Sequence, residues 1–238
     1  MALADLWLDE KTHHERKAAW AGAGGAACPD PSDRPDGGTI PDASPLHGRV
    51  AVRRSARQMG DAAEMETFAP EQDPRAFRTT LGSFATGVTV VTARGPGGEP
   101  VGITANSFAS VSLDPPLVLW SPARSSRRFA AFAEAGHFAI HVLAQDQQAV
   151  CDAFVRAEGG FDAVPWSEGP EGLPLLDGCL ARFLCRREAL LDGGDHAILL
   201  GRVWAASRRD GAPLVFQSGR YGGFLPAEEP HPSPDSAP

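Results

Sequence analysis

Small polar side chains gather in one stretch of the chain, residues 102–116, which reads GITANSFASVSLDPP and lies between two apolar runs. Its hydroxyl and amide groups come from Thr104, Asn106, Ser107, Ser110 and Ser112. Because these side chains are small, the backbone N–H groups of the stretch are open to a ligand. The stretch suits a flat heteroaromatic ring that carries carbonyl and nitrogen acceptors. A polar loop built on Asx and Ser turns is an equal alternative.

A second polar cluster, SSRR at residues 125–128, lies where a helix is expected to begin. Hydroxyls, a guanidinium and the free N–H groups of a helix start together bind anions. The only lysines are Lys11 and Lys17, so an anion bound by later residues must be held by arginine, hydroxyl or backbone groups. The same absence excludes a lysine Schiff base or a P-loop lysine from this part of the chain. Simple N-capping of the helix is the alternative.

A third cluster places His196 at the start of an apolar run, directly after Gly193, Gly194 and Asp195. A glycine-rich turn before a strand brings such a histidine to the mouth of a barrel, where it can meet a ligand. Asp195 is a candidate to orient the imidazole, although neighbouring residues on a strand point to opposite faces. A surface histidine at a strand end is the alternative.

Other patterns are interpreted as structural. GPGGEP at residues 95–100 resembles a dinucleotide fingerprint, but Pro100 stands where the third glycine belongs, so the segment is predicted to be a hairpin turn. His137 and His141 share a strand face without an acidic or cysteine ligand at a matching spacing, so no metal site is expected. The cysteines form no CxxC pair, which favours buried free thiols in a reducing cytoplasm. They are Cys28, Cys151, Cys179 and Cys185.

The composition of the chain limits its class. Its 238 residues, 42% of them hydrophobic, allow one or two domains. The formal net charge of −8 implies no general nucleic-acid surface. No run of 18 apolar residues is present, so no membrane span is expected. With 26 glycines and 21 prolines the chain is rich in turns, which argues against an all-helical bundle.

The sequence divides into three regions. Residues 1–66 contain a Gly, Pro, Asp and Ser run with almost no large apolar side chains, so we expect a disordered N-terminal extension. If the start codon is misassigned, Met59 or Met65 is an alternative start. Residues 226–238 are expected to form a disordered tail. Residues 67–225 are expected to fold as one domain.

Periodicity and turn signals predict the elements of this domain. One helix begins at Asp73–Pro74 and ends near Gly87, a second begins at Ser125–Ser126, and a third spans residues 145–155. The third is expected to gather Ala149, Val150, Ala153 and Phe154 on one face. Strands are predicted over residues 88–93, 101–104, 110–112, 117–120, 137–143, 179–191, 196–207 and 213–216, with a loop over 159–174. Because parallel β–α–β spacing is absent, a closed antiparallel barrel with a few helices is predicted.

The order and spacing of several motifs resemble the flavin reductase family, whose members are FMN-binding split-barrel reductases. The resemblance covers about Phe77 to Phe224. The motifs are FATGVTVVTA (84–93), GITANSFASVSLDPPLV (102–118), SSRRF (125–129), GHFAIHVL (136–143), PLLDGCLARFLCR (174–186), GGDHAILLGRV (193–203) and PLVFQSGRYG (213–222).

This resemblance implies a mainly β fold with a few helices, an antiparallel six-stranded split β-barrel that forms a homodimer with flavin near the interface. The flavin contacts of the family map onto Thr86, Gly87, Val88, Thr89, Thr104, Ala105, Asn106, Ser107, Ser110 and Val111. The phosphate end maps onto Ser125, Ser126 and Arg127, and His196 matches the family residue near the nicotinamide. His141 stands where asparagine is common, and Leu184 stands where an acidic residue often precedes the Cys-Arg pair, which puts fine specificity in question.

The resemblance further implies an NAD(P)H:flavin oxidoreductase. Such an enzyme binds FMN or FAD without a covalent bond, reduces it with NADH or NADPH, and releases it to a partner flavin-dependent monooxygenase. No metal, nucleic acid or membrane is expected to take part. Two alternatives stay open: a flavin-binding carrier or sensor on the same barrel, and a flavoenzyme that keeps its FMN and reduces another substrate.

Overall fold

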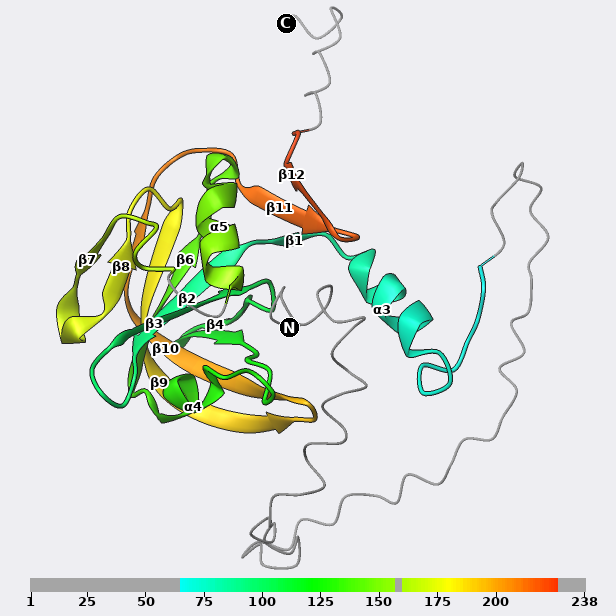
Figure 1. Ribbon diagram of the computed structural model, residues 1–238, viewed down its shortest axis with the longest axis horizontal. Helices are drawn as coiled ribbons and strands as arrows, with labels where there is room; N and C mark the ends of the chain where they lie inside the picture. The colour runs from blue at the N-terminus through cyan, green and yellow to red at the C-terminus, as the bar shows by residue number, and fades with distance from the viewer. Residues whose placement is uncertain (1–64, 157–159, 227–238) are drawn as a thin grey trace, which may run out of the picture. The chain divides into compact units, whose positions relative to one another are not determined.

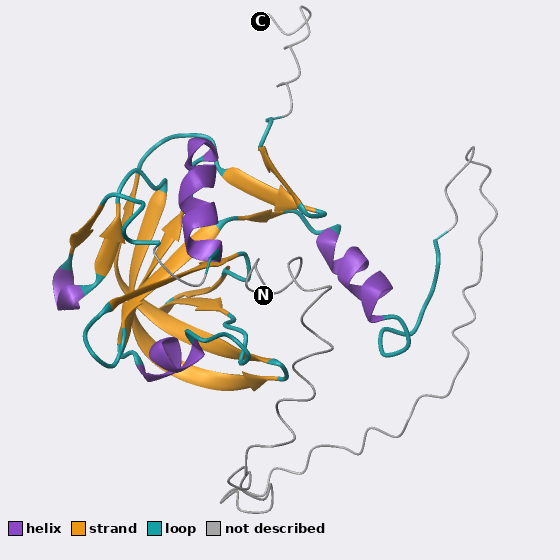
Figure 2. Cartoon of the chain, viewed as in Figure 1, coloured by secondary structure: helices purple, strands orange, loops and turns teal. Residues whose placement is uncertain are grey.

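Antiparallel strands make up most of the computed structural model, which describes residues 65–156 and 160–226 (Figures 1 and 2). The largest sheet of these residues comprises β2 (Thr89–Arg94), β3 (Pro100–Ala105), β4 (Ala109–Leu113), β5 (Pro116–Trp120), β6 (His137–Val142), β9 (Ala181–Gly193) and β10 (His196–Arg208). Its strand order is β3-β2-β6-β9-β10-β5-β4, with every pair antiparallel. The predicted mainly β, antiparallel fold is therefore confirmed.

Two small sheets complete the strands of the described residues. One contains β1 (Thr86–Gly87), β11 (Leu214–Gln217) and β12 (Arg220–Gly223), and the other contains β7 (Trp166–Glu168) and β8 (Pro174–Leu176). Strands β7, β8 and β12 were not predicted, and a loop was predicted over residues 159–174, which contain β7 and the first residue of β8. That segment is rich in Gly and Pro, yet Leu173 and Leu175 are buried against β6 and β9. The segment is therefore ordered by burial against distant strands, which its local composition does not reveal.

The first helix of the described residues, α3 (Pro74–Gly82), begins where the sequence predicts. The Asp73 side chain accepts a hydrogen bond of 2.8 Å from the backbone N–H of Ala76, and Pro74 occupies the first turn. The helix ends at Gly82, earlier than the predicted end near Gly87. The chain instead turns into β1, which pairs with β11, and Ser218 N–H donates to the carbonyl of Gly82 at 2.9 Å.

The two other α-helices of the described residues are α4 (Phe129–Glu134) and α5 (Gln148–Val155), the latter preceded by a 3₁₀ turn at Gln145–Gln147. A second 3₁₀ turn, Pro170–Gly172, leads into β8. The predicted helix start at Ser125–Ser126 is wrong, because residues 123–129 form consecutive turns, with Ser126 N–H bonded to Ala123 and Phe129 N–H bonded to Ser126. In α5, Cys151 and Phe154 are buried as a helical face, whereas the predicted face residue Ala149 is exposed.

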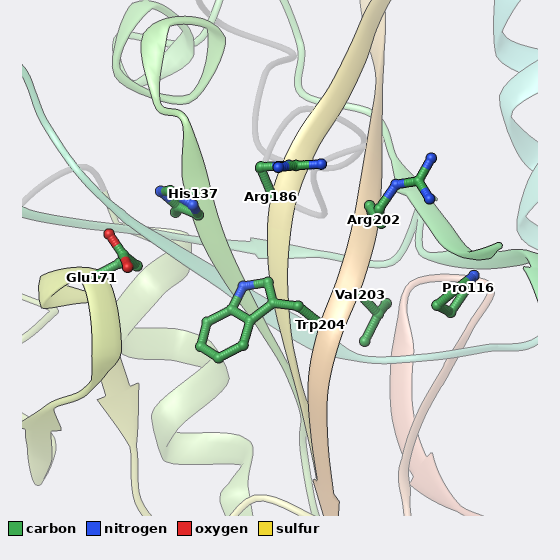
Figure 3. A pocket seen from close by; sticks show the side chains of 7 residues that line it. All are labelled: Pro116, His137, Glu171, Arg186, Arg202, Val203 and Trp204. Atoms are coloured by element: carbon green, nitrogen blue, oxygen red, sulfur yellow. The ribbon is translucent and has the colours of Figure 1, made fainter.

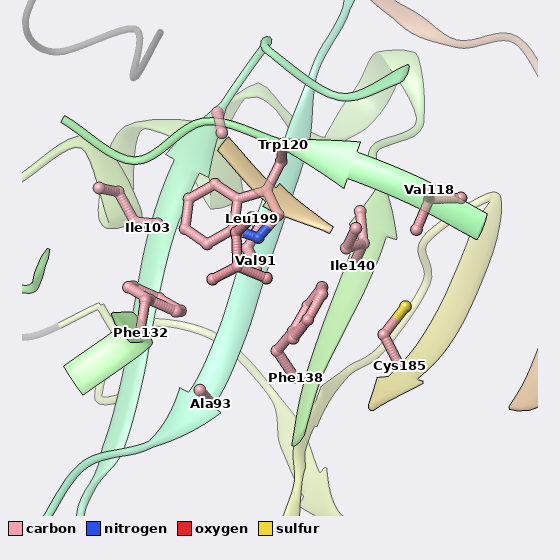
Figure 4. Close-up of a cluster of buried hydrophobic side chains, with 11 residues drawn as sticks. Val91, Ala93, Ile103, Val118, Trp120, Phe132, Phe138, Ile140, Cys185 and Leu199 are labelled. Carbon is pink, nitrogen blue, oxygen red and sulfur yellow. The ribbon is translucent and has the colours of Figure 1, made fainter. Parts of the chain in front are cut away.

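Six strands of the largest sheet contribute to one hydrophobic cluster, and β4 contributes none (Figure 4). Trp120 of β5 lies at its centre, edge-on to Phe132 of α4 with ring centroids 4.9 Å apart. A second cluster lies on the other face of β2, where Val90 packs with Leu143 and Phe154. Strand β2 is thus buried on both faces, which suits its β-branched residues. The predicted barrel count of six strands stays a prediction.

His141 is a buried structural residue. Its Nδ1 lies 3.1 Å from the carbonyl oxygen of Val90, and its Nε2 accepts a hydrogen bond of 3.2 Å from the backbone N–H of Leu176. Burial lowers the pKa of the imidazole from 6.5 to about 3, so the ring is neutral and Nδ1 donates to Val90. Leu184, the other departure from the family pattern, is buried with Ala139, Leu173 and Leu175.

The cysteines of the described residues carry free thiols. Cys151 and Cys185 are fully buried, as predicted, and burial raises the pKa of the two thiols to about 11 and about 12. Cys179 is only half-buried. Of the predicted extension over residues 1–66 and the predicted tail over residues 226–238, residues 1–64, which include Cys28, and residues 227–238 lie outside the described residues. Within the described residues, no helix has the length and apolar character needed to cross a bilayer.

Candidate functional site

The antiparallel pairing of β2 with β3 begins at Thr89 and Ala105, whereas Thr86 and Gly87 belong to β1 and pair with β11. Thr89 is paired with Ala105, and the Thr89 hydroxyl donates to the Ala105 carbonyl at 2.7 Å. The Thr104 hydroxyl donates to the carbonyl of Cys151 at 2.7 Å and so ties β3 to α5. Both threonines are almost completely buried. Their hydroxyl protons are therefore used to fix the strand ends that carry the other candidate residues.

Ser107 joins the end of β3 to the end of β5. Its Oγ accepts a hydrogen bond of 2.9 Å from the backbone N–H of Ser121 and lies 3.3 Å from the Ser121 carbonyl oxygen. This contact places the turns over residues 121–128 next to Asn106. Ser110 and Val111 follow on β4, the sheet edge, where both are exposed.

His196, at the start of β10, contacts the same turns over residues 121–128. Ala123 forms an isolated antiparallel bridge with His196, and Ala197 N–H donates to the carbonyl of Pro122 at 3.0 Å. The three polar clusters found in the sequence, far apart along the chain, are thus connected through Ser107–Ser121 and Ala123–His196. Residue types and local start signals pointed to each cluster, but only the contacts in the structure show that they meet.

Two polar atoms at this junction, and one on β1 three residues before β2, are buried and have no hydrogen-bond partner among the described residues. They are Thr86 Oγ1, Asn106 Oδ1 and His196 Nε2. Buried polar atoms are normally paired, so each of these points to a group that the protein itself does not supply. A hydroxyl, an amide oxygen and an imidazole nitrogen can bond the N–H and carbonyl groups of a flavin ring or a nicotinamide amide, so these residues fit such ligands. The other orphaned atoms, Trp120 Nε1 and Arg182 Nε, belong to residues outside the three clusters.

The predicted phosphate residues lie in the turns before α4 and not at a helix start. Ser125 and Arg127 are exposed, and Ser126 is half-buried. Neighbouring Arg128 donates through Nη1 to the carbonyls of Gly102 and Phe154, both at 2.8 Å, so it holds β3 and the end of α5. Arg127 makes no hydrogen bond or ion pair with another described residue. Among residues 125–128, Arg127 is therefore the arginine available to an anion.

The His196 ring is oriented by its neighbour in sequence. Nδ1 lies 2.7 Å from Asp195 Oδ1, and the side chain of His196 is 14% exposed whereas that of Asp195 is 93% exposed. Adjacent strand residues point apart, but Asp195 lies in the turn before β10, which lets its carboxylate face back. Because an ionised carboxylate can only accept, the contact directs an Nδ1 proton at Asp195 and leaves Nε2 as the ring atom that faces a ligand.

A separate hollow of about 350 Å³ lies on another part of the surface (Figure 3). Its walls come from β5, β6, β10, β9 and the Pro170–Gly172 turn, and it contains none of the predicted site residues. The residues that line it are Pro116, His137, Glu171, Arg186, Arg202, Val203 and Trp204. His137 begins β6, whereas Val142, at the other end of the strand, pairs with Thr89. His137 therefore lies away from the candidate site.

The fold and the junction together define a class of protein, an antiparallel barrel with a ligand-facing cluster at its strand ends. Residues 81–224 match the family model described as "Flavin reductase like domain", so the chain belongs to that family. The predicted class, a flavin reductase, is confirmed by this membership.

Three individual proteins show which flavin reductases this chain is similar to. The chain is 57% identical over 153 residues to an "FMN reductase (NADH)" of Agrobacterium fabrum, covering 64% of this chain and 87% of that protein. It is 46% identical over 156 residues to the reductase subunit of a "Flavin-dependent monooxygenase" of Rhodococcus jostii, covering 65% and 80%. Among solved structures, the "NADH:FAD oxidoreductase" of Streptomyces globisporus superposes with a TM-score of 0.65 at 38% identity, covering 72% of this chain and 99% of that one.

Proposed function

We propose that the protein reduces free FMN or FAD with NADH. The observation that carries this proposal is the set of orphaned polar atoms, Asn106 Oδ1 and His196 Nε2 at one junction and Thr86 Oγ1 on β1, in a chain of the flavin reductase family. The relatives named above are an NADH-dependent FMN reductase and an NADH:FAD oxidoreductase. When bound, the flavin supplies the redox chemistry, because its ring accepts the hydride that the reduced nicotinamide gives up.

The residues at the ends of β2 and β3 would hold the flavin ring. Thr86 and Asn106 offer the free acceptor atoms, and the paired, buried residues Thr89 and Ala105 lie three residues after the first and directly before the second. A Cβ placed on Gly87 would meet no atom within 4 Å, so space is open above β1. Gly87, Val88, Ser107, Ser110 and Val111 would complete the wall. Ser125, Ser126 and Arg127 would hold the phosphate, because no lysine is available there.

His196 would position the nicotinamide. With Nδ1 directed at Asp195, its Nε2 can accept a hydrogen bond from the carboxamide N–H₂ of the dinucleotide. The role is one of orientation, since hydride transfer needs no general acid. Correct placement of the reacting atoms is itself a large part of catalysis in such a reaction.

One experiment separates this function from its alternatives. Purified protein is mixed with NADH or NADPH and with FMN or FAD in four pairs, and the loss of dinucleotide absorbance is followed. Rapid oxidation that depends on added flavin supports the reductase. Flavin binding without oxidation would identify a carrier or sensor. Flavin that stays bound through gel filtration, with no response to added flavin, would identify a flavoenzyme that acts on another substrate.

We further propose that a flavin-dependent monooxygenase consumes the reduced flavin. Several relatives are described as reductase subunits or components of such systems, including those for stachydrine N-demethylation and for trigonelline. The test is to supply a flavin-dependent monooxygenase with this protein, NADH and FMN, either mixed or separated by a dialysis membrane. Product both in the mixed sample and in the sample separated by the membrane indicates free diffusion of flavin. Product only on mixing indicates a direct complex, and no product in either case contradicts the partner.

Two unpartnered apolar features support a homodimer. Strand β4 is a sheet edge with Val111 48% exposed and Leu113 95% exposed, which is a surface that proteins usually cover. Helix α3 buries none of its residues and exposes Phe77 and Leu81. Analytical ultracentrifugation should therefore find a dimer, and Leu113→Glu should shift it toward the monomer while the circular dichroism spectrum stays unchanged. A wild-type monomer at micromolar concentration would contradict this proposal.

The free thiols of Cys151 and Cys185 accord with a reducing compartment, so we place the protein in the cytoplasm as part of this proposal. Cell fractionation with an antibody to the chain tests the assignment. Recovery with periplasmic or extracellular markers would contradict it.

A further inference from the structure

Arg124 contacts the turn that carries His196 through both its backbone and its side chain. Its backbone N–H donates to the carbonyl of Asp195 at 2.9 Å. Its guanidinium donates through Nε to the carbonyl of Gly194 at 3.1 Å and through Nη2 to the carboxylate of Asp192 at 2.8 Å. One arginine therefore bonds three of the four residues that precede His196.

The turn itself is a tight two-residue connection. Gly193 pairs with His196 across the hairpin of β9 and β10, which leaves Gly194 and Asp195 as the central residues. Gly194 has a φ of 75°, and Asp195 does not share this left-handed backbone. Positive φ at the first central residue alone is the type II′ pattern that suits a twisted hairpin. Because Asp195 lies in this turn, the position of its carboxylate, and hence of the His196 ring, depends on where the turn is held.

Arg124 is itself fixed on its other side. The guanidinium carbon lies 5.6 Å from the centre of the Phe129 ring at the start of α4. Ala123, its neighbour, is bridged to His196. The ion pair with Asp192 is exposed, with side-chain exposures of 42% and 84%, so solvent screens it and it stabilises the fold little. The contacts that matter for geometry are those to the two carbonyls. The bond from Nε to the carbonyl of Gly194 depends on the arginine side chain, whereas the backbone bond to Asp195 does not.

We infer that Arg124 is a positioning residue for the flavin-reducing reaction, which acts by holding the Gly194–Asp195 turn so that His196 faces the nicotinamide. This inference rests on the proposed function of His196 and names a further residue that serves it. Arg124 acts through Asp195, whose carboxylate sets the tautomer of His196 and so leaves Nε2 as the free acceptor.

The first measurement is kinetic. Arg124→Ala should raise the KM for NADH and lower kcat/KM about tenfold, because a displaced ring loses near-attack geometry. The Kd for FMN should stay unchanged. Arg124→Lys, which keeps the charge but not the planar fork, should recover only part of the loss. Arg208→Ala removes a more exposed arginine, which lies 4.0 Å from Asp210 at the opposite end of β10, and it should change nothing.

The second measurement tests whether Arg124 acts through His196. In a His196→Ala background, Arg124→Ala should cause no further loss, because the two changes remove one effect. Full additivity would overturn the inference. So would a weaker Kd for FMN together with an unchanged Kd for riboflavin, since that result would make Arg124 a phosphate contact.

A third measurement does not need turnover. In ¹⁵N NMR of the flavin-free protein, the His196 ring should be in the Nδ1–H tautomer, with its signals identified by their loss in His196→Ala. Arg124→Ala should shift the tautomer toward a mixture, and Arg208→Ala should not. An unchanged His196 spectrum in Arg124→Ala would overturn the inference. The wild type could oxidise no NADH with any flavin while Arg124→Ala still changes the tautomer of His196. In that case the proposed function fails, but the positioning contact stands.

Discussion

His196 is the residue on which the proposed chemistry most depends. Its Nε2 is buried and unpartnered while Nδ1 is held by Asp195, so truncation should affect the dinucleotide and not the flavin. His196→Ala should leave the Kd for flavin unchanged and lower kcat/KM for NADH by up to about a hundred-fold. Stopped-flow reduction of bound flavin measures this directly. His137→Ala, on the separate hollow, is the control. An unchanged reduction rate at low and saturating NADH would mean that His196 is a surface residue at a strand end.

Arg127 should carry the phosphate end of the flavin. Of Arg124, Arg127 and Arg128, only Arg127 makes no hydrogen bond or ion pair within the described part of the chain. A charge-assisted hydrogen bond to phosphate stabilises by about 1.5–3 kcal/mol, so Arg127→Ala should weaken FMN binding roughly ten- to a hundred-fold. Riboflavin, which lacks the phosphate, should bind as before. Fluorescence titration of both flavins decides, and an equal loss for both would assign Arg127 a structural role.

His141 should make the free energy of unfolding depend on pH. Its pKa is about 3 when folded and 6.5 ordinarily, so below pH 6.5 the unfolded chain binds a proton that the folded chain does not. The stabilisation is fully present above pH 6.5 and is lost as the pH falls toward 3. In urea unfolding from pH 7.5 to 4, His141→Asn should show a shallower pH dependence than the wild type. Parallel curves for the two proteins would contradict this origin.

At the scale of elements, Gly102 of β3 should be required for the packing of α5. A Cβ at this position would lie 2.5 Å from Phe154 Cε1 and 3.2 Å from Phe161 Cζ, both of them partly or fully buried rings. Gly102→Ala should therefore lower the free energy of unfolding by about 1–3 kcal/mol. Gly136→Ala is the matched control, because a Cβ there meets no atom within 4 Å. Equal urea midpoints for the two variants would show that α5 moves aside freely.

Sequence patterns located most elements because their signals are local. The cap at Asp73, the turn before Pro100 and the alternation in β6 each depend on neighbours in the chain. The predicted start of the second helix failed because a polar SSRR cluster does not reveal that Arg128 is drawn to carbonyls on β3 and α5. The hairpin of β7 and β8 was missed for the same kind of reason, since its order comes from burial against distant strands.

For the candidate site as well, the sequence predicted the features that are local and missed those that depend on distant residues. The three polar clusters were identified from residue types alone, and Asn106 and His196 are the members that keep unpartnered atoms. Thr86, the third candidate residue with such an atom, was named only through the family resemblance. Sequence alone did not show that the hydroxyls of Thr89 and Thr104 are used within the protein, because their acceptors lie 16 and 47 residues away. It also did not single out the contacts of Arg124, since its partners Asp192 and Gly194 are 68 and 70 residues away.

At the scale of the whole molecule, residues 1–64 should be dispensable for flavin reduction. The family match begins at residue 81, and the first helix is capped locally by Asp73. A chain that starts at Met65 should keep its melting temperature, its dimer and its kcat/KM within about twofold. A chain that starts at Phe84 should fare worse, because it lacks α3 and the contact of Ser218 with Gly82. Calorimetry, ultracentrifugation and the flavin assay compare the three lengths. Loss of activity or solubility on removing residues 1–64 alone would show that this segment belongs to the folded enzyme.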